Sequence, residues 1–169
     1  MEEQPGAPGA PGAVVRRLMG DARQAALATT LAPTALARNG SGQPYVSLVL
    51  VALDRDGSPI LLLSDLADHC RNLKAEPRAA LLFDGAAGLE DPLAGERASV
   101  LGRIEPVTAG DIAKRLKTDF VARHPSATTY VDFGDFHLYR MAVESAHLVA
   151  GFGRIHWLTA ADVIADPGN

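Results

Sequence analysis

Two short apolar segments joined by a turn constrain the fold of this chain most strongly. Residues 45–53 read YVSLVLVAL and residues 59–64 read PILLLS, and between them DRDG at 54–57 has the residue types of a tight turn. Two such segments on either side of a turn predict a β-hairpin. Both segments are apolar at nearly every position, so we expect both faces of each strand to be covered. A barrel whose outside packs on helices or on a second subunit meets that condition.

The rest of the chain supplies further strands with helices between them. Apolar periodicity, together with the Pro and Gly residues that bound each segment, indicates where these elements lie. The expected helices span residues 14–23, 66–75 and 108–123, and the expected additional strands span residues 25–31, 79–83, 97–107, 136–144, 147–152 and 153–158. This order predicts an α+β, mainly β fold, in which an antiparallel barrel of about six to seven strands is flanked by helices.

Length and composition predict the domain organisation. A chain of 169 residues suits one domain, and we assign residues 14–164 to it. Residues 1–13 are rich in Pro and Gly and contain little that can pack, so a disordered N-terminal tail is expected there. Residues 165–169 are expected to form a short C-terminal tail.

Charge and cysteine content narrow the partners and the compartment. The 16 basic and 20 acidic residues give a net charge of −4, and without a Lys/Arg run this argues against nucleic acid as the main partner. No apolar run approaches the roughly 20 residues that span a bilayer, so no membrane association is expected. The single cysteine, Cys70, excludes an intramolecular disulfide framework. With an acidic start that does not resemble a signal peptide, these features predict a cytoplasmic protein.

The segment SDLADHCRN at residues 64–72 is the first candidate for chemistry. A strand leads into a helix N-terminus here, where unbonded backbone N–H groups and the helix dipole favour an anion. The Ser64 hydroxyl, with His69 and Arg71 on the first two turns, would suit a phosphomonoester. The alternative is an ordinary capped helix with solvated side chains, and the spacing alone favours that alternative.

Other candidates are weaker on pattern alone. Ser47 is a polar residue in an apolar strand, and it either bonds to backbone or points into a ligand site. In GFGRIHW at 151–157, Arg154, His156 and Trp157 would stack on a planar ring and pair with acid groups, or the segment is a terminal strand with a half-buried Trp. The histidines form no HExxH motif and no i, i+4 pair, so no preformed metal site is expected.

Six segments in this order also carry a resemblance to a known family. They are PYVSLV at 44–49, PILLLSDLADHCRNL at 59–73, EPRAALLF at 76–83, the stretch 91–103, YVDFGDF at 130–136 and GFGR at 151–154. Together they resemble the FMN-binding split barrels of the pyridoxamine 5′-phosphate oxidase superfamily. The last two look most like the HugZ-type branch, which is known for haem utilisation. The resemblance covers roughly residues 14–160.

The resemblance implies a homodimer that holds two FMN molecules in clefts between its subunits. By position, it assigns phosphate and ribityl contacts to Ser47, Ser64, His69, Arg71 and Asn72. It places Ser99 near the flavin ring. It further implies that Arg154 and Trp157 reach the site from the other subunit and close it.

The function that this resemblance implies is an FMN-dependent oxidoreductase whose small-molecule substrate is unknown. Pyridoxamine 5′-phosphate oxidases carry basic residues where this chain has Tyr45, Ser47, His69 and Cys70, so that particular activity is not expected. One alternative is a haem-binding or haem-degrading protein, for which His156 is a candidate axial ligand. Another is a flavin-binding protein without catalytic activity.

Overall fold

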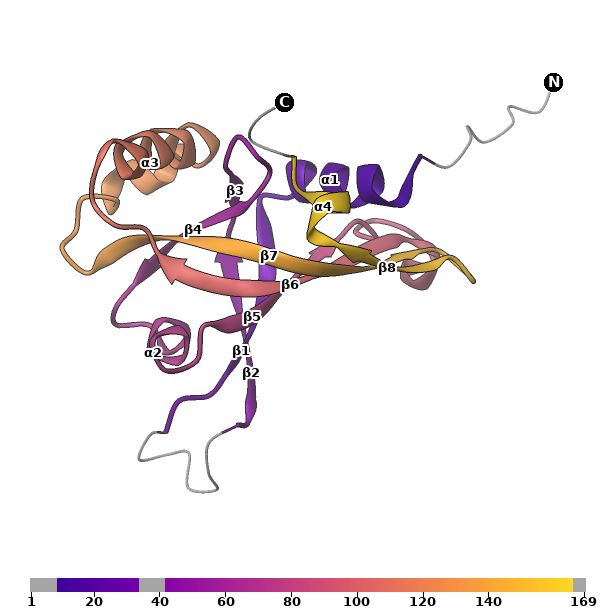
Figure 1. The fold of residues 1–169 in the computed structure, drawn as a ribbon, viewed down its shortest axis with the longest axis horizontal. Coiled ribbons are helices and arrows are strands. Elements are labelled where there is room, and N and C mark those ends of the chain that lie inside the picture. Colours follow the sequence, from indigo (N-terminus) through magenta and orange to yellow (C-terminus); the bar gives the residue numbers. More distant parts are fainter. Residues whose placement is uncertain (1–8, 34–41, 166–169) are drawn as a thin grey trace.

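A computed structural model describes residues 9–33 and 42–165, and these residues form one antiparallel sheet of eight strands. The strands are β1 Gln24–Thr30, β2 Pro44–Leu50, β3 Ala52–Leu53, β4 Pro59–Ser64, β5 Arg78–Asp84, β6 Glu96–Pro106, β7 Phe136–Ala150 and β8 Ile155–Thr159. Their order is β2-β1-β5-β6-β7-β4-β3, with β8 added beside β7 (Figure 1). The predicted α+β split barrel is therefore confirmed.

The sheet curls into a barrel because its two end strands, β2 and β3, belong to one continuous segment of the chain. β2 lies antiparallel to β1 over its whole length, whereas β3 pairs with β4 at the opposite end of the sheet. Val51 separates the two strands and donates its N–H to the Arg23 carbonyl. The expected hairpin is therefore correct only next to its turn. Beyond Val51 the first strand leaves β4 and pairs with β1 instead.

The helices lie outside the curled sheet (Figure 1). They are α1 Pro11–Asp21, α2 Asp68–Ala75, α3 Asp111–Arg123 and α4 Ala160–Val163. α1 buries Val15 and Met19 in the main core, and α3 buries Leu116 and Phe120 in a second cluster. None of these helices in residues 9–33 and 42–165 is long and apolar enough to cross a membrane.

Helix starts differ most from the sequence-based expectation. α1 begins at Pro11, three residues before the expected start at residue 14, because Pro is favoured at the first helical position. α2 begins at Asp68, two residues after the expected start at residue 66, without a side-chain cap, and Leu66 is 74% exposed outside the helix. α3 begins at Asp111, three residues after the expected start at residue 108, and its N-cap residue Gly110 offers no side-chain cap. The tails were expected at 1–13 and 165–169. Residues 11–13 instead belong to α1, and residues 1–8 and 166–169 lie outside the described residues.

A single strand, β7, replaces the two strands expected at 136–144 and 147–152. Ser145 and Ala146, which lie between them, do not end the strand, because a β-bulge absorbs the irregularity. Leu101 of β6 pairs with Ser145 and Gly102 pairs with Val143, which leaves Glu144 as the extra residue. β7 can therefore pair with β4 near its start and with β8 near its end.

The bulge depends on a glycine. A Cβ added to Gly102 would lie 2.1 Å from the Ala142 carbonyl oxygen of the paired strand. Replacing Gly102 by alanine is expected to lower the free energy of unfolding by about 2–3 kcal/mol, because the β7 backbone must shift. Urea unfolding measures this change. Gly134→Ala, where an added Cβ meets nothing within 4 Å, should leave the midpoint nearly unchanged. Equal midpoints for wild type and Gly102→Ala would contradict the close approach.

Candidate functional site

An open groove of about 280 Å³ lies where β2 parts from β4 and the chain enters α2. Most of its wall is aliphatic, and two aromatic side chains close one side. The lining residues are Leu48, Val49, Leu50, Leu62, Leu63, Ser64, Ala67, His69, Tyr130 and Phe136. The ring centroids of Tyr130 and Phe136 are 4.9 Å apart. The groove therefore offers a mainly apolar surface with a few polar groups near the start of α2.

Ser47 and His69 meet at this groove. Ser47 Oγ lies 3.1 Å from His69 Nδ1, so β2 and the first turn of α2 are joined by a hydrogen bond. Burial lowers the pKa of His69, and the Asp68 carboxylate opposes this shift only in part, so the imidazole is neutral at pH 7. With Nδ1 fixed by Ser47, Nε2 has no hydrogen-bond partner among residues 9–33 and 42–165. Such an imidazole can bind a ligand or a metal ion through Nε2.

The Ser64 hydroxyl is already committed within the chain. Its Oγ donates to the Asp135 carboxylate at 2.5 Å and accepts from the Leu66 N–H at 3.1 Å. Asp65 N–H donates to the Asp135 carbonyl at 2.7 Å. Ser64 therefore ties the entry of α2 to the loop before β7. Its proton is directed at a carboxylate and not at the groove.

The charges around the start of α2 come in pairs. Arg71 bonds to Asp68 and Lys74 bonds to Asp65, each at 2.8 Å. Asp135, whose carboxylate accepts from Ser64, adds a third carboxyl group at the entry of α2. The backbone N–H groups of Asp68 and His69 have no acceptor in the described part of the chain, but the surrounding carboxyl groups oppose a phosphate dianion. The donors present therefore fit an FMN phosphate poorly, whereas the apolar wall fits a flat aromatic group.

Asn72 lies beneath the groove and is 1% exposed. Its side chain donates to Thr29 Oγ1 at 2.9 Å and accepts from the Ala32 N–H at 2.8 Å. The amide nitrogen and the amide oxygen of Asn72 are thus both hydrogen-bonded, and these bonds fix α2 against β1. In this structure Asn72 positions the helix that carries His69.

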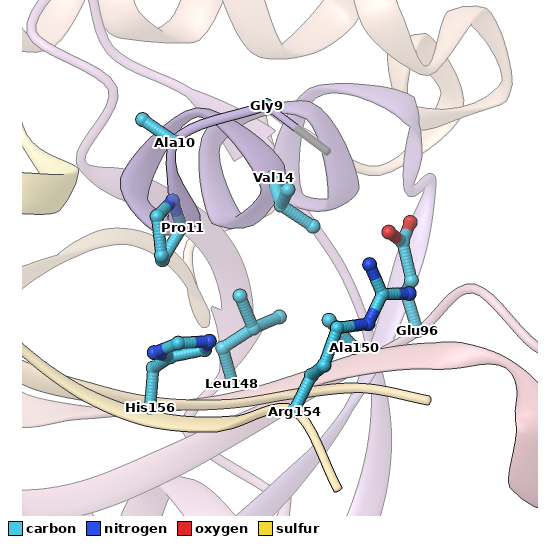
Figure 2. A pocket seen from close by; sticks show the side chains of 9 residues that line it. All are labelled: Gly9, Ala10, Pro11, Val14, Glu96, Leu148, Ala150, Arg154 and His156. Carbon is cyan, nitrogen blue, oxygen red and sulfur yellow. The ribbon is translucent and has the colours of Figure 1, made fainter. Parts of the chain in front are cut away.

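The predicted residues of the C-terminal strand point to two different faces. Successive side chains of a strand alternate between faces. Trp157 lies on the outer face of the sheet, with its ring centroid 4.6 Å from that of His147. Arg154 and His156 instead line a cavity beneath α1 (Figure 2). Within one subunit, none of these three residues lines the groove.

The outer face of the sheet carries a row of mainly apolar side chains, in which Ser99 and His147 are the polar members. In register across six strands, this row, named here the outer row, is Leu48, Ala26, Leu82, Ser99, His147 and Trp157. Leu48 and Trp157, at its two ends, are 65% and 67% exposed. Leu48 also lines the groove, so the groove opens beside the outer row.

Reasoning from the sequence missed three residues of this site, Tyr130, Asp135 and Phe136. They are brought to the groove by the pairing of β4 with β7, in which Ser64 faces Phe136. Asp135 lies 71 residues from the serine that it binds, and no local pattern reports so distant a contact. The available signal is the aromatic-rich segment YVDFGDF at residues 130–136, which carries part of the family resemblance.

Comparisons with known proteins agree with this architecture. The family model "CREG, beta-barrel" matches residues 10–164. The chloroplastic non-canonical heme oxygenase HOZ of Arabidopsis thaliana is 39% identical over 110 residues, covering 65% of this chain and 33% of that protein. The chain therefore spans about one third of the length of this relative. A heme binding protein of Mycobacterium smegmatis has a TM-score of 0.82 at 27% identity, over 95% of this chain and 64% of that structure.

A more distant structure supports the fold alone. A protein from Clostridium acetobutylicum, related to general stress protein 26 and to the pyridoxinephosphate oxidase family, has a TM-score of 0.65 at 15% identity. The match covers 88% of this chain and 94% of the Clostridium acetobutylicum protein. The expected relation to this superfamily is confirmed by these matches. Because the family model spans nearly all the described residues, the chain belongs to the CREG β-barrel family, with the split-barrel fold of the pyridoxamine 5′-phosphate oxidase-like proteins.

Proposed function

We propose that this chain is a haem-binding protein that holds the iron of the haem through His69. The observation that carries the proposal is the neutral imidazole in an apolar groove, oriented at Nδ1 by Ser47 and open at Nε2. Imidazoles that ligate metals commonly use their second nitrogen in such an orienting bond. Two relatives, HOZ and the Mycobacterium smegmatis protein, are named as a heme oxygenase and a heme binding protein. These relatives favour haem over other ligands. Bound haem would supply redox and dioxygen chemistry, so haem degradation is the associated activity that we propose.

His69 suits this role better than His156, the residue suggested by the sequence. His156 lines a cavity of about 220 Å³, which is smaller than typical sites for cofactors. The groove beside His69 is also small, but it is open, and a second hollow of about 410 Å³ shares Leu62 and Phe136 with it. That second hollow has Lys114 and Lys117 among its lining residues. Both are ion-paired, with Asp111 and Asp132, so the carboxylates of a haem would have to share these ammonium groups.

We also propose that the protein is a homodimer and that the outer row forms its interface. A second copy would cover Leu48 and Trp157, which are otherwise exposed to water. Since Leu48 lines the groove as well, the partner would lie at the mouth of the groove and exclude water from it. This arrangement also gives Ser99 and Trp157 a place near the bound group, although neither lines the groove within one subunit.

An FMN-dependent oxidoreductase, or a non-catalytic flavin-binding protein, is the second candidate. The apolar wall and the two backbone N–H groups at the start of α2 favour it. The carboxyl groups of Asp65, Asp68 and Asp135 disfavour it, because Arg71 would have to leave Asp68 to reach a phosphate. In that case Arg71→Ala would weaken FMN binding.

Titration of the full chain with haemin and with FMN separates these functions. We expect a saturable Soret shift with haemin, which His69→Ala abolishes and the control His156→Ala, in the separate cavity beneath α1, leaves unchanged. We expect no quenching of FMN fluorescence at comparable concentrations. Saturable FMN quenching without a Soret shift would support the second candidate. A Soret shift that survives in His69→Ala would contradict the assigned ligand, and the absence of both signals would contradict both functions.

A further inference from the structure

A separate cavity of about 220 Å³ lies between the first turn of α1 and the paired strands β7 and β8 (Figure 2). Its apolar lining comes mainly from Val14, Leu148 and Ala150. Arg154 and His156 reach it from the β8 side (Figure 2). It shares no lining residue with the groove that contains His69.

The backbone of the β7–β8 turn fixes the position of Arg154. Gly151 and Gly153 have φ values of +94° and +73°, which side-chain-bearing residues rarely adopt. The Ala150 N–H donates to the Arg154 carbonyl at 2.9 Å and closes the turn. Arg154 is therefore held at the edge of the cavity by a defined turn.

The polar residues of this cavity leave a positive charge without a partner. Within residues 9–33 and 42–165, Arg154 makes no ion pair or hydrogen bond, and the ring nitrogens of His156 have no partner. Glu96 is the acidic residue of the lining, and it is paired with Arg17 of α1. The guanidinium of Arg154 is thus available to an anion that enters the cavity.

We propose that this cavity binds a small organic carboxylate with an apolar body. A guanidinium binds a carboxylate through two parallel hydrogen bonds, and His156 can donate a further one. The apolar part of the ligand would lie against Val14, Leu148 and Ala150. An apolar cavity of about 150 Å³ accommodates benzene, so this cavity matches a molecule the size of benzoate. The site is independent of the haem proposal, because it uses different residues.

The test is an NMR titration of the full ¹⁵N-labelled chain with benzoate, and with benzyl alcohol as the uncharged match. Benzoate is expected to shift the amide signals of Val14, Ala150 and Arg154 in a saturable way, and benzyl alcohol to bind at least about tenfold more weakly. Arg154→Ala should weaken benzoate binding by a similar factor. Arg103→Ala, which removes an exposed arginine outside this lining, should leave it unchanged.

A second variant tests the cavity itself. Val14→Phe places a larger side chain in the proposed apolar part of the site and should abolish the benzoate shifts while Arg154 is retained. The proposal is overturned if benzoate causes no saturable shifts in the wild type. It is also overturned if benzyl alcohol binds as well as benzoate, or if Arg154→Ala binds benzoate with wild-type affinity.

Discussion

Replacing Asp54 by alanine is expected to lower the free energy of unfolding by about 2–4 kcal/mol at neutral pH. The Asp54 side chain is 10% exposed and joins three elements of the fold. It accepts from Arg115 of α3 at 2.8 Å, from Arg140 of β7 at 3.1 Å and from the Arg55 N–H at 2.7 Å. Removing it leaves two guanidinium groups without their shared partner. Because both arginines are partly exposed, the expected cost is below that of a fully buried pair.

The same carboxylate makes this stabilisation dependent on pH. Burial raises the pKa of Asp54, but hydrogen bonds from Arg115 and its other donors outweigh burial and hold the pKa below its ordinary value of 3.8. A carboxyl group whose pKa is lowered by folding stabilises the protein above its ordinary pKa and loses that effect as the pH falls. The difference between wild type and Asp54→Ala should therefore shrink below about pH 3.8.

Urea unfolding of both proteins at neutral and acidic pH measures these effects. Asp111→Ala is the matched control, since its side chain is 100% exposed and its distance to Lys114 is 3.4 Å. That control is expected to change stability by less than about 0.5 kcal/mol. A similarly small change in Asp54→Ala would show that the ion-pair network contributes little to the fold.

Replacing Leu48 by aspartate is expected to convert the proposed dimer into a monomer. Leu48 lies at the β2 end of the outer row and also at the groove. An uncompensated carboxylate in an interface loses its hydration, so the dissociation constant should rise at least about a hundredfold. Because Leu48 is 65% exposed in one subunit, the variant should fold normally. Sedimentation equilibrium measures both the mass and the dissociation constant.

A matched control distinguishes the outer row from other exposed apolar residues. Ile112 on α3 is 63% exposed, nearly the same fraction as Leu48, but lies outside the outer row. Ile112→Asp should therefore remain dimeric. A dimer that tolerates Leu48→Asp would place the interface elsewhere, and a monomeric wild type would contradict the proposed assembly.

Strand positions were predictable where the local pattern is strong, as at β4, whose bounds agree with the expected 59–64. The pairing partners of the strands were less predictable than their positions. The turn at 54–57 suggested that the strands on both sides pair along their length, but Val51 bonds to Arg23 and the preceding residues pair with β1. The continuity of β7 was also missed, because a bulge at Glu144 leaves no signal in the hydrophobic pattern.

The candidate site was predictable only in part, for similar reasons. Ser47 and His69 were separate candidates on pattern and were assigned to one site by the family resemblance, and the structure brings them together at 3.1 Å. Arg154 and Trp157 were expected to act together, but strand alternation sends them to opposite faces. The carboxylate of Asp135 could not be foreseen, because only the pairing of β4 with β7 brings it to Ser64.

The position of the iron in a crystal of the protein grown with haemin tests the central claim most directly. An anomalous difference map collected at the iron absorption edge locates the metal without reference to the rest of the ligand. We predict one iron per subunit, within coordination distance of His69 Nε2 and beside the apolar wall of Leu48 and Leu62. Iron bound at His156, or at any site away from the groove, would contradict the account.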